Sequence, residues 1–251
     1  MLAGAAASAG ARPPMTTGAL RLGADHALVE SGLATALQRA FGRDTGVGVE
    51  VFAGPALGIL DATAAGECDA ALVNAPDAAG GLDRQGLVHD LRAIADGGFV
   101  LVGPRGRGPV PRSAALGLAG VREAAQVRPD QVIFLSAGDG SGCHLAEQAA
   151  WRAAGIAPAA PWYRPAAAGG PLVAQARAVG AYAIVERGAW LAAGGAPLAL
   201  LVDGDPTLVE RVQAMRSFRS PHPAGKIFLA WIGGGRGHAV VATHRCYRAP
   251  A

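Results

Sequence analysis

The stretch Phe-Leu-Ser-Ala-Gly-Asp-Gly-Ser-Gly-Cys-His-Leu-Ala-Glu, residues 134–147, is the most informative segment of this 251-residue chain. An apolar run over 132–135 gives way to small and polar residues up to Gly142, and a helical pattern begins at His144. This order predicts a strand, a glycine-rich turn and a helix start. Free backbone N–H groups and the positive end of the helix dipole meet there, so the turn is suited to hold a ligand. The alternative is a plain strand–helix loop in which Ser141 or Asp139 caps the helix.

Composition excludes several classes of protein. Hydrophobic residues make up 51% of the chain and charged residues 16%, which is typical of a globular protein. No apolar run is long enough to span a bilayer, so we expect no membrane insertion. The net charge of +3 is spread along the chain without a basic stripe, so we expect no nucleic-acid partner. Three scattered cysteines and six histidines lack metal-ligand spacing, so neither a metal nor another cofactor is expected.

The N-terminus is ambiguous. Residues 1–12 are rich in alanine and resemble the tail of a signal peptide, but a basic start and a long apolar stretch are missing. Met15 could equally be the translation start. We therefore expect residues 1–18 to be a flexible or targeting segment, and the sequence leaves export open.

Strand and helix signals alternate along the rest of the chain. The expected strands are 19–23, 48–52, 69–74, 99–103, 132–135 and 181–185; the expected helices are 31–41, 59–65, 120–126, 144–154, 171–179 and a last one at 227–232. This alternation predicts an α/β protein with mostly parallel sheets. The Gly/Pro/Arg-rich segment 104–112 is expected to cross between two lobes. We expect 19–104 plus 203–251 to form lobe 1 and 105–202 to form lobe 2, with two hinge crossings and the ligand between them.

A series of sequence blocks resembles the tungstate-binding members of the type II periplasmic solute-binding proteins. These blocks are Ser-Gly-Leu at 31–33, DAALVNAP at 69–76, GFVLVGP at 98–104, SAGDGSGCHLAE at 136–147, Trp-Tyr at 162–163, Gly-Ala-Tyr at 180–182, Glu-Arg-Gly at 186–188 and LVDGDP at 201–206. The resemblance covers residues 20 to about 232. It implies the type II periplasmic-binding-protein fold, a monomer that holds a small-molecule ligand, an ABC transporter permease as partner, and a periplasmic location. Because no convincing signal peptide is present, a cytoplasmic location stays an alternative.

The chain departs from this family at the loops that hold the oxyanion. Where the family's first strand ends in Thr-Thr-Thr-Ser, this chain has Ala24-Asp25-His26-Ala27. The Arg and Thr of the family's glycine-rich turn are Ala137 and Cys143, and Pro55 removes a backbone donor from the next loop. A dianion taken from water needs many donors, so these losses disfavour tungstate. Smaller and less polar walls favour a larger organic ligand, anionic and cofactor-like molecules included.

Two alternative functions stay open: a tungstate or molybdate receptor of an ABC transporter, and an enzyme of cofactor biosynthesis on the same fold. Neither paired carboxylates nor a Ser/His/Asp set has recognisable spacing, so no catalytic residue is predicted. A collapsed, ligand-free cleft would produce the same substitutions.

The candidate ligand-binding residues lie on the loops that the resemblance places around the cleft. They are His26, Ala27, Gly54, Ala56, Gly98, Ala137, Asp139, Ser141, Gly142, Cys143, His144, Gly169, Gly170 and Arg187. Arg187 is the best remaining cation for an anionic ligand, or else an ion-pair partner of Glu186 or Asp139. Cys143 could be a reactive thiol at a helix start, although a structural role is favoured. Trp162 and Tyr163 either wall the cleft or pack between the lobes.

Overall fold

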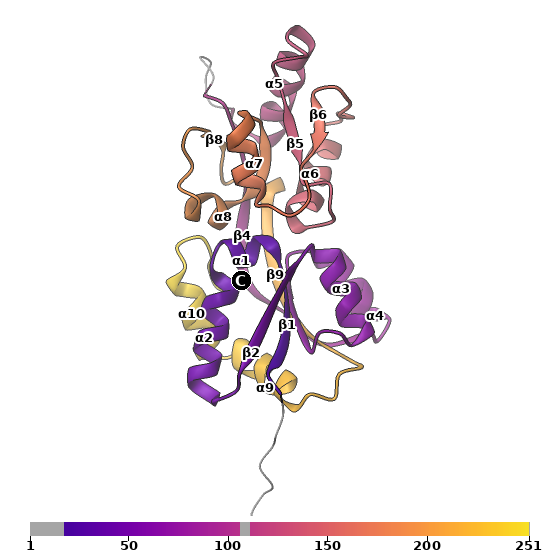
Figure 1. Ribbon diagram of the computed structural model, residues 1–251, viewed down its shortest axis with the longest axis vertical. Coiled ribbons are helices and arrows are strands. Elements are labelled where there is room, and N and C mark those ends of the chain that lie inside the picture. Colours follow the sequence, from indigo (N-terminus) through magenta and orange to yellow (C-terminus); the bar gives the residue numbers. More distant parts are fainter. Residues whose placement is uncertain (1–17, 106–110, 251) are drawn as a thin grey trace, which may run out of the picture.

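The computed structural model describes residues 18–105 and 111–250, and these residues form two lobes stacked along the long axis of the molecule (Figure 1). The long strands β4 (Val88–Gly103) and β9 (Val209–Ser217) run between the lobes (Figure 1). This arrangement confirms the predicted α/β class. The expected targeting segment falls almost entirely on residues outside the described part of the chain. None of the helices in the described part is long and apolar enough to cross a membrane.

The first lobe is built on three strands, of which β1 pairs in parallel with β2 and with β3. Its elements are β1 (Leu20–Asp25), α1 (His26–Glu30), α2 (Leu33–Thr45), β2 (Val49–Gly54), α3 (Ala56–Ala65), β3 (Ala70–Val73), α4 (Pro76–Arg84), α9 (Pro223–Ile232) and α10 (Gly235–Thr243). The helix predicted at 227–232 is thus α9. The prediction that it is the last helix of the chain is wrong, because α10 follows it.

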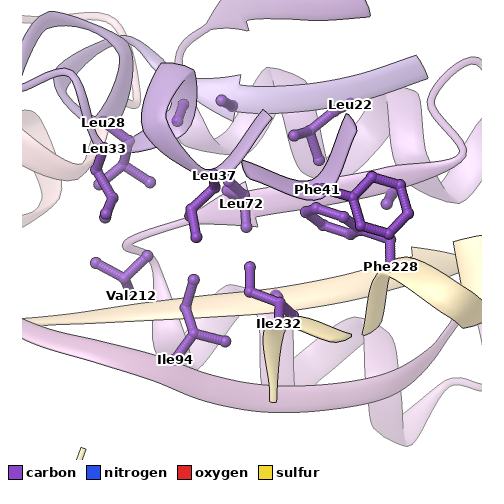
Figure 2. Packing of buried hydrophobic residues seen from close by; sticks show 14 of the residues in the cluster. Leu22, Leu28, Leu33, Leu37, Phe41, Leu72, Ile94, Val212, Phe228 and Ile232 are labelled. Carbon is purple, nitrogen blue, oxygen red and sulfur yellow. The ribbon is translucent and has the colours of Figure 1, made fainter. Parts of the chain in front are cut away.

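The core of the first lobe lies between its sheet and helices α1, α2 and α9 (Figure 2). Leu22 and Leu72 project from the strands, and Phe41 and Phe228 meet edge to face with ring centroids 5.2 Å apart. Burial on both faces explains why β3 is a continuous apolar run. This rigid base fixes the position of Asp25 at the end of β1.

The second lobe carries the glycine-rich turn. Its elements are α5 (Ala114–Val127), β5 (Phe134–Ser136), α6 (Gly142–Ala153), β6 (Tyr163–Pro165), α7 (Leu172–Val179), β7 (Ala183–Glu186), α8 (Arg187–Ala192) and β8 (Ala199–Val202). Phe134, Trp151, Trp162 and Tyr163 form an aromatic cluster inside this lobe. Trp162 and Tyr163 therefore pack neither against the ligand cavity nor between the lobes.

The strands that join the lobes correct two predictions. Strand β4 pairs antiparallel with β9 in the first lobe, and its residues 99–103 pair antiparallel with β7 and β8 in the second. The chain therefore crosses to the second lobe on β4, and it returns on β9 after the 3₁₀ turn η1 (Pro206–Leu208). The predicted crossing was segment 104–112, of which residues 106–110 lie outside the described part, and β4 has already reached the second lobe before it. Because β9 must run back against β4 and β3, the sheet is mixed, and the prediction of mostly parallel sheets is wrong.

The lobe boundaries expected after residues 104 and 202 stay predictions. The pairing of β4 changes between Gly98, whose partner is Val209 of β9, and Phe99, whose partner is Glu186 of β7. The change of lobe thus lies within β4, a few residues before the expected boundary.

Candidate functional site

A cavity of about 560 Å³ lies between the lobes, where the carboxyl end of β1 faces the turn between β5 and α6. Its lining residues come from four segments of the chain. These are Asp25, His26, Ala27 and Glu30 at the end of β1 and in α1; Pro55 before α3; Ala137, Gly138, Asp139, Ser141 and Cys143 at the turn and the start of α6; and 165–172 with Gln175 around β6 and α7. Small apolar residues make up much of the wall.

The predicted site residues are only partly brought together. Those that line the cavity are His26, Ala27, Ala137, Asp139, Ser141, Cys143, Gly169 and Gly170. Those that do not are Gly54, Ala56, Gly98, Gly142, His144 and Arg187. Gly54 and Ala56 flank the lining residue Pro55, while Gly98 and Arg187 line a second hollow of about 330 Å³. As ligand contacts, all fourteen stay predictions.

The charged groups of the cavity lining are mainly acidic. Asp25, Glu30 and Asp139 contribute carboxyl groups, His26 contributes an imidazole, and no Arg or Lys of the described residues lines the cavity. Burial, followed by the charges of Asp25 and Asp139, raises the pKa of Glu30 to about 7. Burial also raises the pKa of Asp25, against the hydrogen bonds that this group accepts. The carboxyl groups thus disfavour one another's charge in this cavity.

Several N–H groups of the glycine-rich turn donate to the protein's own acceptors. Ser141 caps α6, with its Oγ accepting from the N–H of His144 at 3.4 Å. The N–H of Gly140 donates to His144 Nδ1 at 3.0 Å, and the N–H of Ser141 donates to Asp139 Oδ1 at 2.9 Å. His144 and Asp139 thus stabilise the turn itself. These donors are not free for a ligand in this conformation.

Asp25 connects the two lobes. Its Oδ1 accepts a hydrogen bond of 3.0 Å from the N–H of Ala27, and its Oδ2 accepts one of 3.1 Å from the N–H of Gly142. The side chain is fully buried. A second link is the 3.1 Å bond from the N–H of Leu57 to the carbonyl of Gly140. The lobes are therefore in contact beside the cavity.

Gly142 is required by close packing. Asn74, directly after β3 in the first lobe, lies against it, and a Cβ added to Gly142 would overlap the side-chain amide of Asn74. Asn74 is itself buried and donates from Nδ2 to Glu210 Oε1 at 2.7 Å. The glycine at the start of α6 thus allows the two lobes to approach each other.

Two fully buried glutamates lie at the hinge, and the sequence did not identify either as a site residue. Glu186 ends β7 and caps α8 by accepting from the N–H groups of Gly188 and Ala189 at 2.5 and 2.6 Å. Burial raises the pKa of Glu186 to about 7. Burial and the charge of Glu186 raise the pKa of Glu210 well above its ordinary value. Glu186 was visible in the Glu-Arg-Gly block, whereas Glu210 lies on a strand that no pattern predicted.

Arg187 does not supply a cation to the cavity. Its Nε lies 3.0 Å from Asp203 Oδ2, and both side chains are about one-third exposed. Its partner is thus neither Glu186 nor Asp139. Among the described residues that line the cavity, His26 is the one whose side chain can carry a positive charge.

Cys143 is 7% exposed, and burial raises the pKa of its thiol well above the ordinary value, with Asp25, Glu186 and Glu210 adding to the shift. A thiolate is the reactive form, so this environment disfavours a nucleophilic role. Within 18–105 and 111–250, no group of three or more His, Cys, Asp or Glu residues is arranged to hold a metal ion.

The profile of the PBP superfamily domain matches residues 15–218. The chain belongs to this superfamily. It is 29% identical over 182 residues to a protein of Haloferax volcanii described as an ABC transporter anion-binding protein, a match over 70% of this chain and 51% of the relative. It is 31% identical over 163 residues to the tungstate-binding protein TupA of Peptoclostridium acidaminophilum, over 64% of this chain and 57% of the relative. The chain thus spans little more than half the length of these relatives.

Among solved structures, the tungstate ABC transporter from Geobacter sulfurreducens superposes with a TM-score of 0.73 at 25% identity. The match covers 89% of this chain and 97% of that chain. The periplasmic-binding-protein fold and the resemblance to tungstate-binding proteins, both predicted from the sequence, are confirmed.

Proposed function

We propose that this PBP superfamily protein binds a small organic molecule, uncharged or cationic, in the cavity between its lobes. The observation that carries the proposal is the cavity lining, to which the described part of the chain contributes three carboxyl groups and neither Arg nor Lys. A volume of about 560 Å³ and the many Ala, Gly and Pro contacts suit an organic ligand. The anionic ligands that the sequence left open are disfavoured by Asp25, Glu30 and Asp139.

A compact dianion such as tungstate would lose its hydration and would need several donors in return. The N–H groups of Gly140, Ser141 and Gly142 already donate to protein acceptors. Ala137 offers no side-chain donor where an arginine would supply charge-assisted hydrogen bonds. A tungstate ion in this cavity would therefore face carboxyl groups with little compensation.

A tungstate or molybdate receptor is the second candidate. Two observations favour it: the 31% identity to a protein named as tungstate-binding, and the structural match to a tungstate ABC transporter. It would require Asp25 and Glu30 to be protonated, which their raised pKa values favour.

The partner and location are proposed from the relatives. Their names include ABC transporters, so we infer that the closed, ligand-bound protein docks on a transporter permease on the outer side of the cytoplasmic membrane. Hinge motion on β4 and β9 would open the cavity to release the ligand.

Native mass spectrometry of the purified protein tests the ligand class. We expect an adduct whose mass matches an organic molecule, with elemental analysis showing no tungsten or molybdenum bound at stoichiometric level. One tungstate or molybdate ion retained per chain would overturn the proposal in favour of the second candidate.

A further inference from the structure

Asp25 holds one backbone donor from each lobe at the wall of the cavity. Its Oδ1 accepts from Ala27 in α1 of the first lobe at 3.0 Å, and its Oδ2 accepts from Gly142 in α6 of the second at 3.1 Å. From this geometry we infer that Asp25 is a specificity-determining residue, whose carboxyl oxygens occupy backbone donors that an oxyanion in the cleft would need. The inference rests on the proposed function and names the residue that sets its selectivity.

Both oxygens of this carboxylate are used, and each is used by a different lobe. Charge-assisted bonds to backbone N–H groups are the kind of contact by which proteins bind oxyanions. The N–H of Gly142 belongs to the first turn of the twelve-residue helix α6, where the helix dipole also favours negative charge. The side chain of Asp25 thus accepts the backbone hydrogen bonds that a dissolved oxyanion would need to accept.

The surrounding structure keeps Asp25 in this place. Its backbone ends β1, in register with Gly54 of β2, and its side chain is fully buried. On the other side, Gly142 is pressed against Asn74 with no room for a side chain. The carboxylate therefore cannot turn away without breaking contacts in both lobes.

Helix capping alone does not account for an aspartate here. Asparagine and serine cap a helix about as well, without placing a charge in a buried position. Burial raises the pKa of Asp25 against the opposing effect of the two N–H groups and His26, and the charge of Asp139 adds to the rise. The bond to the opposite lobe is the property that distinguishes Asp25 from an ordinary cap.

The test compares Asp25→Ser and Asp25→Asn with wild type. Serine removes the charge and frees the N–H of Gly142; asparagine is isosteric and can still cap α1. Asp205 provides a matched control, because it also accepts from two backbone groups, Thr207 N–H and Ala114 N–H, but lies outside the cavity lining. The controls are therefore Asp205→Ser and Asp205→Asn, and circular dichroism verifies that each variant is folded.

Tungstate, molybdate and sulfate are titrated into each protein by calorimetry. We expect the Asp25 variants to bind tungstate or molybdate at least tenfold more tightly than wild type, and the Asp205 variants to behave as wild type does. Folded Asp25 variants that bind no oxyanion better than the Asp205 controls would overturn the inference and leave the proposed function standing. If wild type itself binds tungstate tightly, the proposed function fails, and a further gain on replacing Asp25 would still support the role of this residue.

Discussion

The side-chain amide of Asn74 donates a 2.7 Å hydrogen bond to Oε1 of Glu210, which ties the end of β3 to the returning strand β9. The other oxygen of Glu210, Oε2, is buried and has no donor among the described residues. Burial and the charge of Glu186, the neighbouring carboxyl group, raise the pKa of Glu210. The raised pKa values of both groups favour a proton held within this carboxyl pair.

This pair predicts that the protein is more stable in mild acid than at neutral pH. The pKa of Glu186 is about 7 in the folded chain, against an ordinary value of 4.5. Between these values the unfolded chain releases its proton while the folded chain keeps it, so the free energy of unfolding falls as pH rises through this window. The titration of Glu186 lowers the free energy of unfolding by up to ~3 kcal/mol over this window. Urea unfolding between pH 4.5 and 8 measures it.

Replacing Glu210 with Gln should flatten that pH dependence. The glutamine can keep the bond from Asn74 through its oxygen and donate permanently to Glu186 through its amide nitrogen. We expect Glu210→Gln to exceed wild type in stability at pH 8 by about 1 kcal/mol, a typical net value for one hydrogen bond, and to match it near pH 5. Glu123→Gln, an exposed change on α5, is the control. If the stability of Glu210→Gln fell with pH as steeply as that of wild type, the carboxyl pair would not be the cause of the pH dependence.

Gly142→Ala should weaken the contact between the lobes, because the new Cβ overlaps the amide of Asn74. Overpacking of this kind costs about 1–3 kcal/mol, and thermal or urea unfolding would report the loss. Gly120→Ala on α5 is the comparison, since a Cβ there meets nothing within 4 Å, and it should raise stability by about 0.5–1 kcal/mol. If Gly142→Ala were as stable as wild type, the side chain of Asn74 would not be packed tightly against position 142.

The three cysteines should differ in reactivity. Cys143 is buried and the pKa of its thiol is raised well above the ordinary value, so the folded protein should resist iodoacetamide at this position at pH 8. Cys246 is only partly buried and should react first. Peptide mass spectrometry after timed labelling gives the order. If Cys143 were labelled as fast as a free thiol, it would be a reactive cysteine and not a structural one.

Arg187→Ala should leave ligand retention unchanged. Arg187 pairs with Asp203 and lines the second hollow, not the cavity. A partly exposed pair of this kind contributes about 0–1 kcal/mol, so the melting temperature should fall only slightly. Native mass spectrometry of the variant checks retention, with Asp203→Ala as the companion. If Arg187→Ala lost the adduct and Asp203→Ala kept it, Arg187 would be a ligand contact after all.

The fold was largely predictable because its signals are local. The apolar run at 132–135, the glycines after it and the helix from His144 occur together in sequence. Strand β9 was not predicted, because Glu210 and Arg211 interrupt its apolar pattern, and nothing local indicates that Glu210 is fully buried. The crossing was misplaced because Pro and Gly in 104–112 are strong loop signals. The real crossing, β4, carries its glycines at 97 and 98, within a strand.

The site was predictable only as a set of loops. The sequence indicated that an arginine and several hydroxyls were missing relative to the family, and that Asp25 stood in their place. It could not indicate that Asp25 and Glu30 would share a cavity with Asp139, more than a hundred residues away, or that Asp25 would bond to Gly142. Those relationships arise only when the lobes close on each other.

Calorimetric titration of the ligand-free wild-type protein with sodium tungstate at pH 7 measures the selectivity of the cavity most directly. A cavity lined by Asp25, Glu30 and Asp139 should give no heat of binding up to millimolar tungstate, because the lining offers the dianion no Arg or Lys among the described residues and Asp25 occupies the N–H of Gly142. Saturable 1:1 binding at micromolar or lower concentration would show that the cleft is an oxyanion receptor.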